Sequence, residues 1–371
     1  MKEIIFYCPR KASMAEISGE NIRPFRMISA FEEMGFRVHK IIGDVPERKN
    51  RINNIKKAML VGKIKPAFVY MESTNLPLPL STAGQKLPAF CLDLNFLYWL
   101  KKRGVKISLF YRDLYWKFDN WWKRQGVIRG CLIWPFYYYE LYQYVKITDL
   151  IFCPSVEFAK IIQTFRKSAR CIPLPPGCDI HSDLPLPKIN PSLNLFYVGG
   201  CKPPTYDLSI LFLACKKLKK NVHLTVCTRK DEWNLSKKVY KNYIGDNVTV
   251  VHESGVELRK RYLLSHISIL PIHNDEYRAL AMPLKLFEAI GYNRPIIAGT
   301  NCAAGRFVEA NGIGWVTDES VENLVISIEK ILEKPDLLNN AIINIKKLQP
   351  QHTWQARAIS VAKLMEKTSQ E

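Results

Sequence analysis

Residues 282–299 read Met282-Pro-Leu-Lys-Leu-Phe-Glu288-Ala-Ile-Gly291-Tyr-Asn-Arg-Pro295-Ile-Ile-Ala-Gly299. The pattern predicts a short helix that ends at Gly291 and a buried strand that starts at Pro295. Residues three apart share one helical face, so Lys285 and Glu288 can contact the same ligand. A lysine suits a phosphate and a carboxylate suits a pair of ribose hydroxyls, which indicates a nucleotide site. The alternative is a surface ion pair between them, worth only about 0.2–0.5 kcal/mol.

Short apolar runs alternate with helical patterns along most of the chain. This alternation predicts parallel sheets with helices on both faces. The expected strands are Ile4–Cys8, Arg37–Ile42, Ala67–Met71, Lys106–Tyr111, Leu150–Cys153, Leu193–Val198, Val222–Cys227, Asn247–His252, Ile267–Pro271 and Pro295–Ala298. Apart from the helix at Lys285, the expected helices are Ile22–Glu33, Pro88–Lys102, Ser209–Lys219, Ser254–Leu264, Val321–Leu332 and Thr353–Met365.

The length of 371 residues favours two domains over one. Six prolines between residues 172 and 191 give that stretch the composition of a linker. We therefore expect an α/β protein with Rossmann-like domains at residues 1–180 and 181–352 and a C-terminal helix at 353–371. Ligands of such proteins bind in the cleft between the domains.

The 54 Lys and Arg residues exceed the 34 Asp and Glu residues, which gives a formal net charge of +20. The excess predicts an anionic partner: nucleic acid, acidic lipid or a phosphorylated substrate. The ten cysteines form no Cys-x-x-Cys pair and the histidines show no ligand spacing, so neither a metal site nor a redox dithiol is indicated. The start, Met1-Lys-Glu-Ile-Ile-Phe6, lacks signal-peptide features, which favours the reducing cytoplasm.

The two α/β halves, the proline-rich linker and the Pro-x-Lys-x-x-Glu helix followed by Gly and a Pro-initiated strand resemble glycosyltransferases of the GT-B fold. The resemblance is to the family-4, or group 1, type of bacterial surface polysaccharide synthesis, such as that of capsule or O-antigen. Val198-Gly199-Gly200 and the Thr353-Trp354 start of the final helix match the same pattern. The resemblance implies two Rossmann-like domains facing each other across a cleft, with the final helix crossing back to the first domain.

The resemblance also implies roles for individual residues. Glu288 would hold the ribose hydroxyls of a nucleotide-sugar donor, and Lys285 would contact its phosphates. Gly199 and Gly200 would let the backbone approach the donor diphosphate closely. Many relatives carry a second, sugar-contacting glutamate eight residues before the ribose-binding one. This chain has Leu280 there, so the sugar half of the site departs from the family.

Further candidates lie near these residues. Arg229 follows a predicted strand where GT-B enzymes often place diphosphate-binding cations; a solvated loop is the alternative. Gly305 lies in Ala303-Ala-Gly305-Arg306, where small residues permit a sugar phosphate to approach a helix start, although a tight turn explains them as well. The segment Ser18–Asn21 either caps a helix or lines the acceptor side of the cleft.

Asp113 is the candidate catalytic residue. It follows the predicted strand Lys106–Tyr111, and an aspartate at the carboxyl end of a strand points toward the mouth of the cleft. If the reaction needs a general base to deprotonate the acceptor hydroxyl, Asp113 is the first choice. The alternative is a structural contact between Asp113 and Arg112.

A basic and aromatic region marks the first half of the chain. Residues 101–130 carry nine Lys or Arg and two Asp, and 14 of the 35 residues from Phe110 to Tyr144 are aromatic. Such a surface suits an anionic bilayer. Stacked single-stranded nucleic acid is a second option, but no nucleic-acid motif stands beside it. Buried core at Trp134–Tyr144 is a third, and we favour the bilayer.

The sequence therefore predicts a glycosyltransferase of hexosyltransferase type, with a retaining outcome, that moves a sugar from a UDP- or GDP-sugar to a hydroxyl of an oligosaccharide or lipid-linked glycan. Its expected partners are the nucleotide sugar, the acceptor and the anionic cytoplasmic face of the inner membrane, and not nucleic acid. No cofactor beyond the donor and no metal is expected, because Lys285, Arg229 and backbone amides can stabilise the departing diphosphate. The alternatives are a sugar-nucleotide epimerase of the same fold and a non-catalytic pathway subunit.

Overall fold

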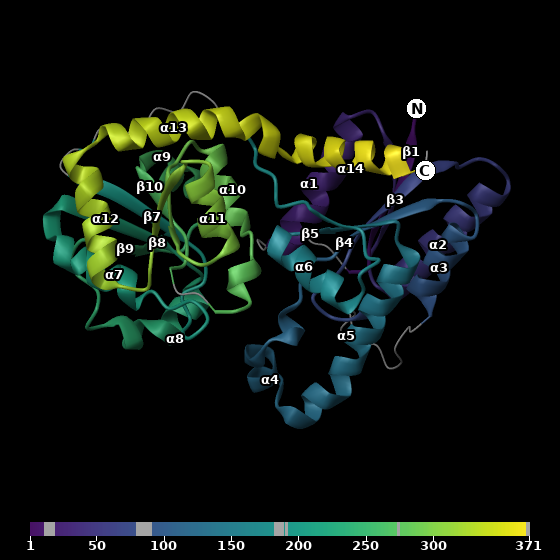
Figure 1. Ribbon diagram of the computed structural model, residues 1–371, viewed down its shortest axis with the longest axis horizontal. Coiled ribbons are helices and arrows are strands. Elements are labelled where there is room, and N and C mark those ends of the chain that lie inside the picture. The colour runs from purple at the N-terminus through teal and green to yellow at the C-terminus, as the bar shows by residue number, and fades with distance from the viewer. Residues whose placement is uncertain (11–18, 79–90, 182–188, 190–191, 273–274, 369–371) are drawn as a thin grey trace. The chain divides into compact units, whose positions relative to one another are not determined.

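The computed structural model describes residues 1–10, 19–78, 91–181, 189, 192–272 and 275–368. The chain forms two compact units, and Figure 1 labels the helices and strands of each where there is room. The first comprises Met1–Pro175 and Trp354–Glu371, and the second comprises Pro176–Thr353. The sequence analysis placed the divisions at residues 180 and 352. In the structure the chain passes between the units after Pro175, in the proline-rich linker, and after Thr353, at the start of the final helix.

The first unit contains a parallel six-stranded sheet in the order β2-β1-β3-β4-β5-β6. Every strand is short, and β1, β3 and β5 are almost entirely buried, as expected for strands covered on both faces. The strands are β1 (Glu3–Cys8), β2 (Arg37–Ile42), β3 (Pro66–Glu72), β4 (Lys106–Phe110), β5 (Leu150–Cys153) and β6 (Cys171–Pro173).

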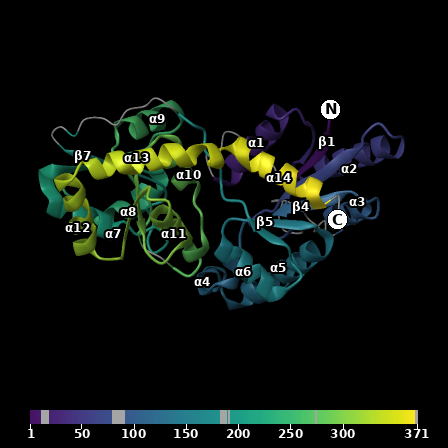
Figure 2. The ribbon, with the colours of Figure 1, turned by 45° about the horizontal axis from the view of Figure 1, so that its top comes forward.

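The helices of the first unit connect these strands in the βαβ manner. The C-terminal helix α14 packs against α1 and β4 (Figure 2). The helices are α1 (Gly19–Glu33), α2 (Val45–Leu60), α3 (Leu92–Lys101), α4 (Asp119–Gln125), α5 (Val127–Ile147), α6 (Val156–Phe165) and α14 (Trp354–Thr368).

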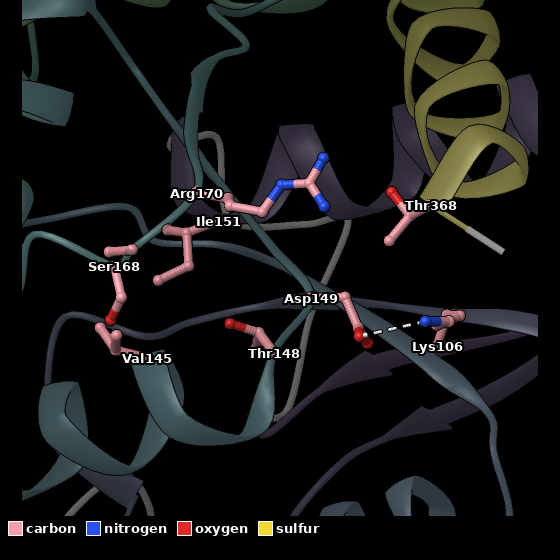
Figure 3. A pocket seen from close by; sticks show the side chains of 9 residues that line it. Lys106, Val145, Thr148, Asp149, Ile151, Ser168, Arg170 and Thr368 are labelled. Carbon is pink, nitrogen blue, oxygen red and sulfur yellow. Dashed lines mark ion pairs between the residues drawn. The ribbon is translucent and has the colours of Figure 1, made fainter. Parts of the chain in front are cut away.

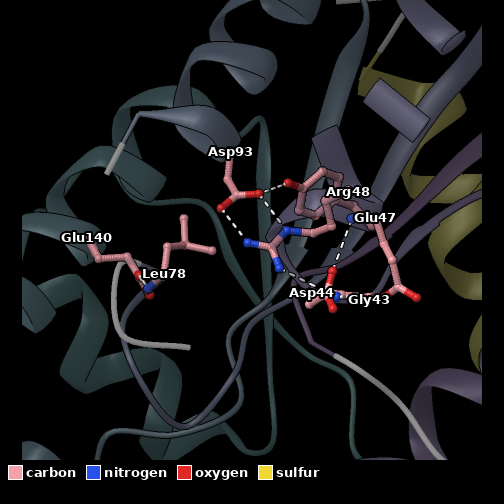
Figure 4. Close-up of polar contacts among 8 residues, drawn as sticks. Gly43, Asp44, Glu47, Arg48, Leu78, Asp93 and Glu140 are labelled. Carbon is pink, nitrogen blue, oxygen red and sulfur yellow. Dashed lines mark hydrogen bonds and ion pairs between the residues drawn. The ribbon is translucent and has the colours of Figure 1, made fainter. Parts of the chain in front are cut away.

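A buried ion pair fixes α2 and α3 to the sheet of the first unit. Arg48 donates from Nε to Asp93 Oδ1 at 2.9 Å and from Nη2 to Asp93 Oδ2 at 3.0 Å, while its Nη1 donates to the Gly43 carbonyl (Figure 4). The Tyr7 hydroxyl of β1 also donates to Asp93. Because each guanidinium nitrogen of Arg48 and each carboxylate oxygen of Asp93 takes part in a hydrogen bond, the desolvation of both charges is offset inside the core.

The second unit repeats the architecture with a parallel six-stranded sheet in the order β12-β11-β10-β7-β8-β9. Its strands are β7 (Leu193–Val198), β8 (Val222–Cys227), β9 (Val248–Val251), β10 (Ile267–Ile269), β11 (Ile296–Gly299) and β12 (Gly314–Thr317). Its helices are α7 (Ser209–Leu218), α8 (Lys230–Tyr240), α9 (Gly255–Leu264), α10 (Leu284–Gly291), α11 (Ala303–Ala310), α12 (Val321–Glu333) and α13 (Asp336–Leu348). The predicted class, two parallel α/β units with a final helix on the first, is confirmed.

Some predicted elements differ in detail from the structure. The strands expected at Asn247–His252 and Ile267–Pro271 are shorter, because only Val248–Val251 and Ile267–Ile269 pair with neighbours. The helix expected at Pro88–Lys102 is described from Leu92 onward, and its first residues lie outside the described part. Seven of the ten free cysteines are buried and act as small core side chains.

Candidate functional site

The six predicted donor-binding residues all lie on connections that leave the strands of the second unit. From β7 the chain moves to β8 and β9 on one side, and β10, β11 and β12 then build the other side, so the order reverses between β7 and β10. Open parallel sheets bind ligands at that point, outside the carboxyl ends of the strands. Gly199 and Gly200 follow β7, Arg229 follows β8, Lys285 and Glu288 lie on α10 after β10, and Gly305 lies on α11 after β11.

One face of helix α10 is buried in the core, and the other face is partly exposed. Its apolar residues Leu286, Phe287 and Ile290 are fully buried, whereas Lys285 and Glu288 are half-buried. The helix ends at Gly291, where a Cβ would lie 2.3 Å from the Asp179 carbonyl oxygen. Glycine is therefore required at the end of α10 because the chain of residue 179 passes directly over it.

Glu288 is oriented by Tyr262 of α9. The Tyr262 hydroxyl donates to Glu288 Oε2 at 3.2 Å, and within the described part of the chain no other residue hydrogen-bonds to this carboxylate. Burial, together with the Glu288 charge, raises the pKa of Tyr262 well above its usual range, so the hydroxyl remains a donor. Tyr262 also stacks on Tyr292 at 4.5 Å, and Tyr292 stacks on His181 at 4.2 Å. The carboxylate is thus held by one oxygen and has capacity for a ligand's hydroxyls.

Lys285 does not form the surface ion pair with Glu288 that was the alternative to a ligand role. No ion pair to Lys285 occurs among the described residues. Its charge acts instead on the thiol of Cys227, at the end of β8: burial raises the pKa of that thiol, and Arg261 and Lys285 partly offset the rise. Lys285 lies on α10, which follows β10, and an anionic ligand at the carboxyl end of the sheet would provide its counter-charge.

Gly199 and Gly200 form a tight turn over two tyrosines. A Cβ on Gly200 would lie 2.5 Å from the Tyr206 ring, and one on Gly199 would lie 2.9 Å from the Tyr197 hydroxyl. That hydroxyl donates to the Gly200 carbonyl at 2.7 Å. The ring contacts alone explain why both positions are glycine, and the predicted approach of a diphosphate stays a prediction.

Glu232 connects Arg229 to the residue that follows the Gly199-Gly200 turn. Its guanidinium pairs with Glu232 on α8, and the same carboxylate accepts the Cys201 amide at 3.1 Å. The Arg229 side chain is 72% exposed. An exposed pair of this kind contributes little stability, so Arg229 can turn to a phosphate at small cost.

Gly305 has a packing role in the structure. A Cβ there would lie 2.1 Å from the Gly299 carbonyl of β11, and its amide donates to Cys302 Sγ at 3.2 Å. Glycine permits α11 to lie close against the strand, which the sequence pattern did not reveal. A phosphate contact by Gly305 stays a prediction.

Around Leu280 lie residues that the sequence did not single out. Leu280 is buried in a single 3₁₀ turn, Arg278–Leu280, which packs against α11. Arg278 lies over the ring of Tyr206 at 4.6 Å, beside the Gly199-Gly200 turn. Asp275 accepts the Arg278 amide at 2.8 Å and so fixes the turn. In the sequence, the only sign of this cluster is the position of Arg278, two residues before Leu280.

Asp113 lies three residues beyond β4 in the first unit. Its carboxylate accepts the Tyr115 amide at 2.9 Å, which stabilises the 3₁₀ turn Tyr115–Lys117. Arg112 makes its structural contact with Glu72, at 2.8 Å. Asp113 therefore has a turn-forming role, and catalysis by Asp113 stays a prediction. Ser18 lies outside the described residues, as do the side chains of the three residues after it.

Among the described residues, no three His, Cys, Asp or Glu side chains gather as metal ligands would. Of the helices in the same described ranges, none combines the length and apolar character that crossing a membrane requires.

One family model matches the sequence of the second unit. Residues 188–348 match the model of the family described as glycosyl transferases group 1. No curated protein matches the chain by sequence.

Solved structures share the fold over the whole chain. Sucrose-phosphate synthase from Thermosynechococcus elongatus matches with a TM-score of 0.68 at 14% identity and 99% coverage of both chains. HepE from Anabaena, in complex with UDP-glucose, matches with a TM-score of 0.62 at 11% identity, covering 99% of this chain and 100% of HepE. WaaG, a glycosyltransferase involved in lipopolysaccharide biosynthesis, matches with a TM-score of 0.58 at 16% identity, covering 98% and 99% of the chains.

The fold is also that of a Listeria monocytogenes protein assigned as a UDP-N-acetylglucosamine 2-epimerase, with a TM-score of 0.55 at 10% identity and coverage of 98% and 95%. At these identities the likeness shows the fold, and the family model matches residues within the second unit. The chain is therefore a two-unit α/β protein of the GT-B glycosyltransferase fold, and its residues 188–348 match the model of the family described as glycosyl transferases group 1.

Proposed function

We propose that the protein is a glycosyltransferase that moves a sugar from a UDP- or GDP-sugar to a hydroxyl of an oligosaccharide or lipid-linked glycan in cell-surface polysaccharide synthesis. The observation that carries the proposal is α10, where Glu288 is held by Tyr262 and Lys285 has no ion-pair partner in the described part of the chain. Both residues belong to the segment that matches the family model. UDP-glucose bound by HepE, which shares the fold, supports the choice of donor.

Each side chain of the site receives one task in this proposal. Glu288 accepts hydrogen bonds from the two ribose hydroxyls, and Lys285 and Arg229 bind the diphosphate. As the bond between sugar and phosphate breaks, negative charge grows on the leaving nucleoside diphosphate, and fixed cations and backbone amides stabilise it. These cations supply the charge stabilisation that a metal ion supplies elsewhere, so we expect transfer to proceed without one. The retaining outcome rests on the family resemblance.

In this proposal the first unit binds the acceptor. Asp113 is proposed as the base that removes the proton of the acceptor hydroxyl, from its position just beyond β4. WaaG, which shares the fold, is involved in lipopolysaccharide biosynthesis, and this supports a glycan of the cell surface as acceptor.

Helix α5 supports contact of the first unit with an anionic membrane surface. Tyr137, Glu140 and Tyr144 are buried, whereas the opposite side exposes a stripe of apolar and aromatic residues. The α5 stripe consists of Val127, Ile128, Leu132, Tyr138, Tyr139 and Tyr142. Exposed cations, Lys123 and Arg129 among them, lie beside it. An apolar stripe with basic neighbours is typical of helices that lie in the bilayer interface, so we place the enzyme at the cytoplasmic face of the inner membrane.

Nucleotide binding tests the donor site directly. UDP or GDP should raise the melting temperature of the full chain, because a ligand that binds only the folded state stabilises it by mass action, by about 2.7 kcal/mol at 100 times the Kd. Lys285→Ala should abolish the shift. In the parent protein dUDP should give a smaller shift than UDP, and Glu288→Gln should remove that difference, because it removes the ribose contact.

Lys330→Ala, at an exposed position of α12, is the matched control and should keep the full response. The absence of a shift with every nucleoside diphosphate would refute the proposal. Full affinity in Lys285→Ala would remove Lys285 from the site.

A further inference from the structure

A fully buried arginine lies just after the helix that carries Lys285 and Glu288. Arg294 is 0% exposed, and none of the residues that the structure describes forms an ion pair with it. Burial lowers the pKa of Arg294 to about 10. Its Nη1 atom has no hydrogen-bond partner in the same described ranges. A buried cation with an unused donor is costly, so packing alone does not explain this residue.

The end of helix α10 fixes where Arg294 lies. Asn293 has a φ of 57°, in the left-handed region, and its amide donates to the Ile290 carbonyl at 3.0 Å. The Arg294 amide donates to the Ala289 carbonyl at 2.9 Å. Together these two bonds form a Schellman motif, a common way for a helix to end. Arg294 is therefore attached rigidly to the helix of Glu288.

The side chain of Arg294 reaches the last turn of α9. Its Nε donates to the Tyr262 carbonyl at 2.7 Å, and its Nη2 donates to the Leu263 carbonyl at 3.3 Å. The last carbonyls of a helix have no donors within the helix, and a cation there also interacts favourably with the helix dipole. The Ser265 hydroxyl donates to the Tyr262 carbonyl as well, at 2.8 Å. Two side chains thus hold the backbone of Tyr262.

The ring of Tyr262 is held as firmly as its backbone. It is 1% exposed, stacks on Tyr292 with 4.5 Å between the ring centroids, and packs edge-on against Phe196 at 4.9 Å. Its hydroxyl donates to Glu288 Oε2 at 3.2 Å. Because the backbone and the ring are both fixed, the hydroxyl is fixed too, and it orients the Glu288 carboxylate.

These contacts form a closed ring around the carboxylate. Helix α10 carries Glu288 and its end positions Arg294, Arg294 binds the backbone of Tyr262, and the Tyr262 hydroxyl returns to Glu288. The ring of contacts joins α9 to α10, so it sets the distance between the hydroxyl and the carboxylate. A carboxylate that is positioned in advance binds its ligand without the cost of being ordered at that moment.

We propose that Arg294 is a positioning residue that acts through Tyr262 to hold the Glu288 carboxylate in place for the two ribose hydroxyls of the donor. Through this contact it sets the preference of the protein for ribonucleotides over deoxyribonucleotides. The inference rests on the proposed transferase function and adds a residue to its donor site. An arginine with a purely structural role would affect folding stability and leave that preference unchanged.

The test is the Kd of dUDP or dGDP divided by the Kd of the matching ribonucleotide, measured by calorimetry on the full chain. Tyr262→Phe removes the hydroxyl and Arg294→Met removes the guanidinium, and each should lower this ratio by about 2-fold to 10-fold, the value of one hydrogen bond. Arg294→Lys keeps the charge and one donor, so its ratio should lie between those of Arg294→Met and the parent protein. An unchanged ratio in every Arg294 variant that folds would overturn the inference.

A double variant separates positioning through Tyr262 from a general loosening of the site. If Arg294 acts through Tyr262, Arg294→Met/Tyr262→Phe should have the same ratio as Tyr262→Phe alone. Additive losses in the double variant would also overturn the inference, because they would show that Arg294 affects the ribose by another route.

Two control variants lose stability without touching the ring of contacts. Ile328→Ala opens a cavity in the core of the second unit, and Asp149→Ala removes an ion pair of 3.7 Å with Lys106 from the first unit. That pair lines a hollow of about 330 Å³ at the amino-terminal ends of β4, β5 and β6 (Figure 3). Both variants should melt at a lower temperature than the parent protein and keep its ratio. A fall in the controls as large as that in Arg294→Met would show that Arg294 is merely structural.

A measurement without nucleotide distinguishes this inference from the donor proposal. With the ζ-carbon of tyrosine isotope-labelled, the magnetic resonance signal of Tyr262 is assigned by its loss in Tyr262→Phe. The signal should shift in Glu288→Gln and in Arg294→Met. A shift in Arg294→Met, together with equal binding of UDP and dUDP or no nucleotide binding by the parent protein, would refute the donor role of Glu288 and leave the positioning by Arg294 standing. No shift in Arg294→Met would overturn the inference.

Discussion

Glu140 on α5 is a carboxyl group enclosed by the core of the first unit. Burial raises its pKa to about 8, and the negative charge of Asp93 adds to the rise, while the Leu78 amide, which donates to the carboxylate, opposes it (Figure 4). The folded state therefore binds a proton that the unfolded state has already released between pH 4.5 and about 8. Over that range the free energy of unfolding should fall as pH rises, and it should level off above.

Glu140→Gln removes this dependence and keeps an oxygen for the Leu78 amide. We expect the variant to match the parent protein near pH 5 and to be more stable by about 2–4 kcal/mol at pH 9. Urea unfolding followed by tryptophan fluorescence at both pH values measures the difference, with the exposed Glu33→Gln of α1 as control. A variant that is less stable than the parent at pH 9 contradicts the assignment.

At the level of residues, the sequence singled out candidate donor-binding residues but not the residues that surround them. Lys285 and Glu288 are three residues apart on one helix, and such a short spacing can be recognised from the sequence alone. The partners of these residues come from distant segments: Tyr262 lies 26 positions before Glu288. The cluster of Arg23, Glu72 and Arg112 joins three elements in the same way, so no short motif announces it. The glycines were recognised, but the tyrosine rings that require Gly199 and Gly200 were not.

At the level of elements, long and apolar patterns were predictable and short or polar ones were not. Strands such as β1 and β7 form continuous apolar runs, which mark buried parallel strands. The strand β6 has only three residues, and α2 is rich in Lys, Arg and Asn, so neither carries a strong periodic signal. For helix α5 the sequence left open whether the segment is buried core or an exposed surface, and the structure shows both: one side is core and the other is exposed.

The exposed side of α5 leads to a binding prediction. Ile128 is 82% exposed and Leu132 is 68% exposed, one helical turn further along. The full chain should sediment with phosphatidylglycerol-containing vesicles at low ionic strength and be released by salt, which screens the basic residues. Ile128→Asp/Leu132→Asp should abolish sedimentation, because it replaces inserted apolar groups by charges that the lipid repels.

Leu235→Asp is the matched control for this experiment. Leu235 is 70% exposed but lies on α8 of the second unit, away from the α5 stripe. Equal vesicle binding of the double α5 variant and the parent protein would exclude α5 as the contact.

At the level of the whole molecule, the two segments through which the chain passes between the units form hydrogen bonds with α10 of the candidate site or with the residues just after it. The Cys178 amide donates to the His352 carbonyl at 2.8 Å, and the His181 amide donates to the Gly291 carbonyl at the end of α10 at 2.9 Å. Gln349 Nε2 reaches Asn293 Oδ1 at 2.7 Å. The helix that carries Lys285 and Glu288 is thus anchored by the chain on either side of the crossing, which links the candidate site to the division of the molecule into two units.

The fate of the nucleotide tests the central claim most directly. The full chain is incubated with a panel of labelled UDP- and GDP-sugars, with and without a glycan acceptor, and nucleotide and sugar are quantified separately. Our account predicts release of free UDP or GDP from one donor, in step with the appearance of the sugar on the acceptor or in water. Release of no nucleoside diphosphate from any donor, or conversion of one nucleotide sugar into another with the nucleotide still attached, would contradict it.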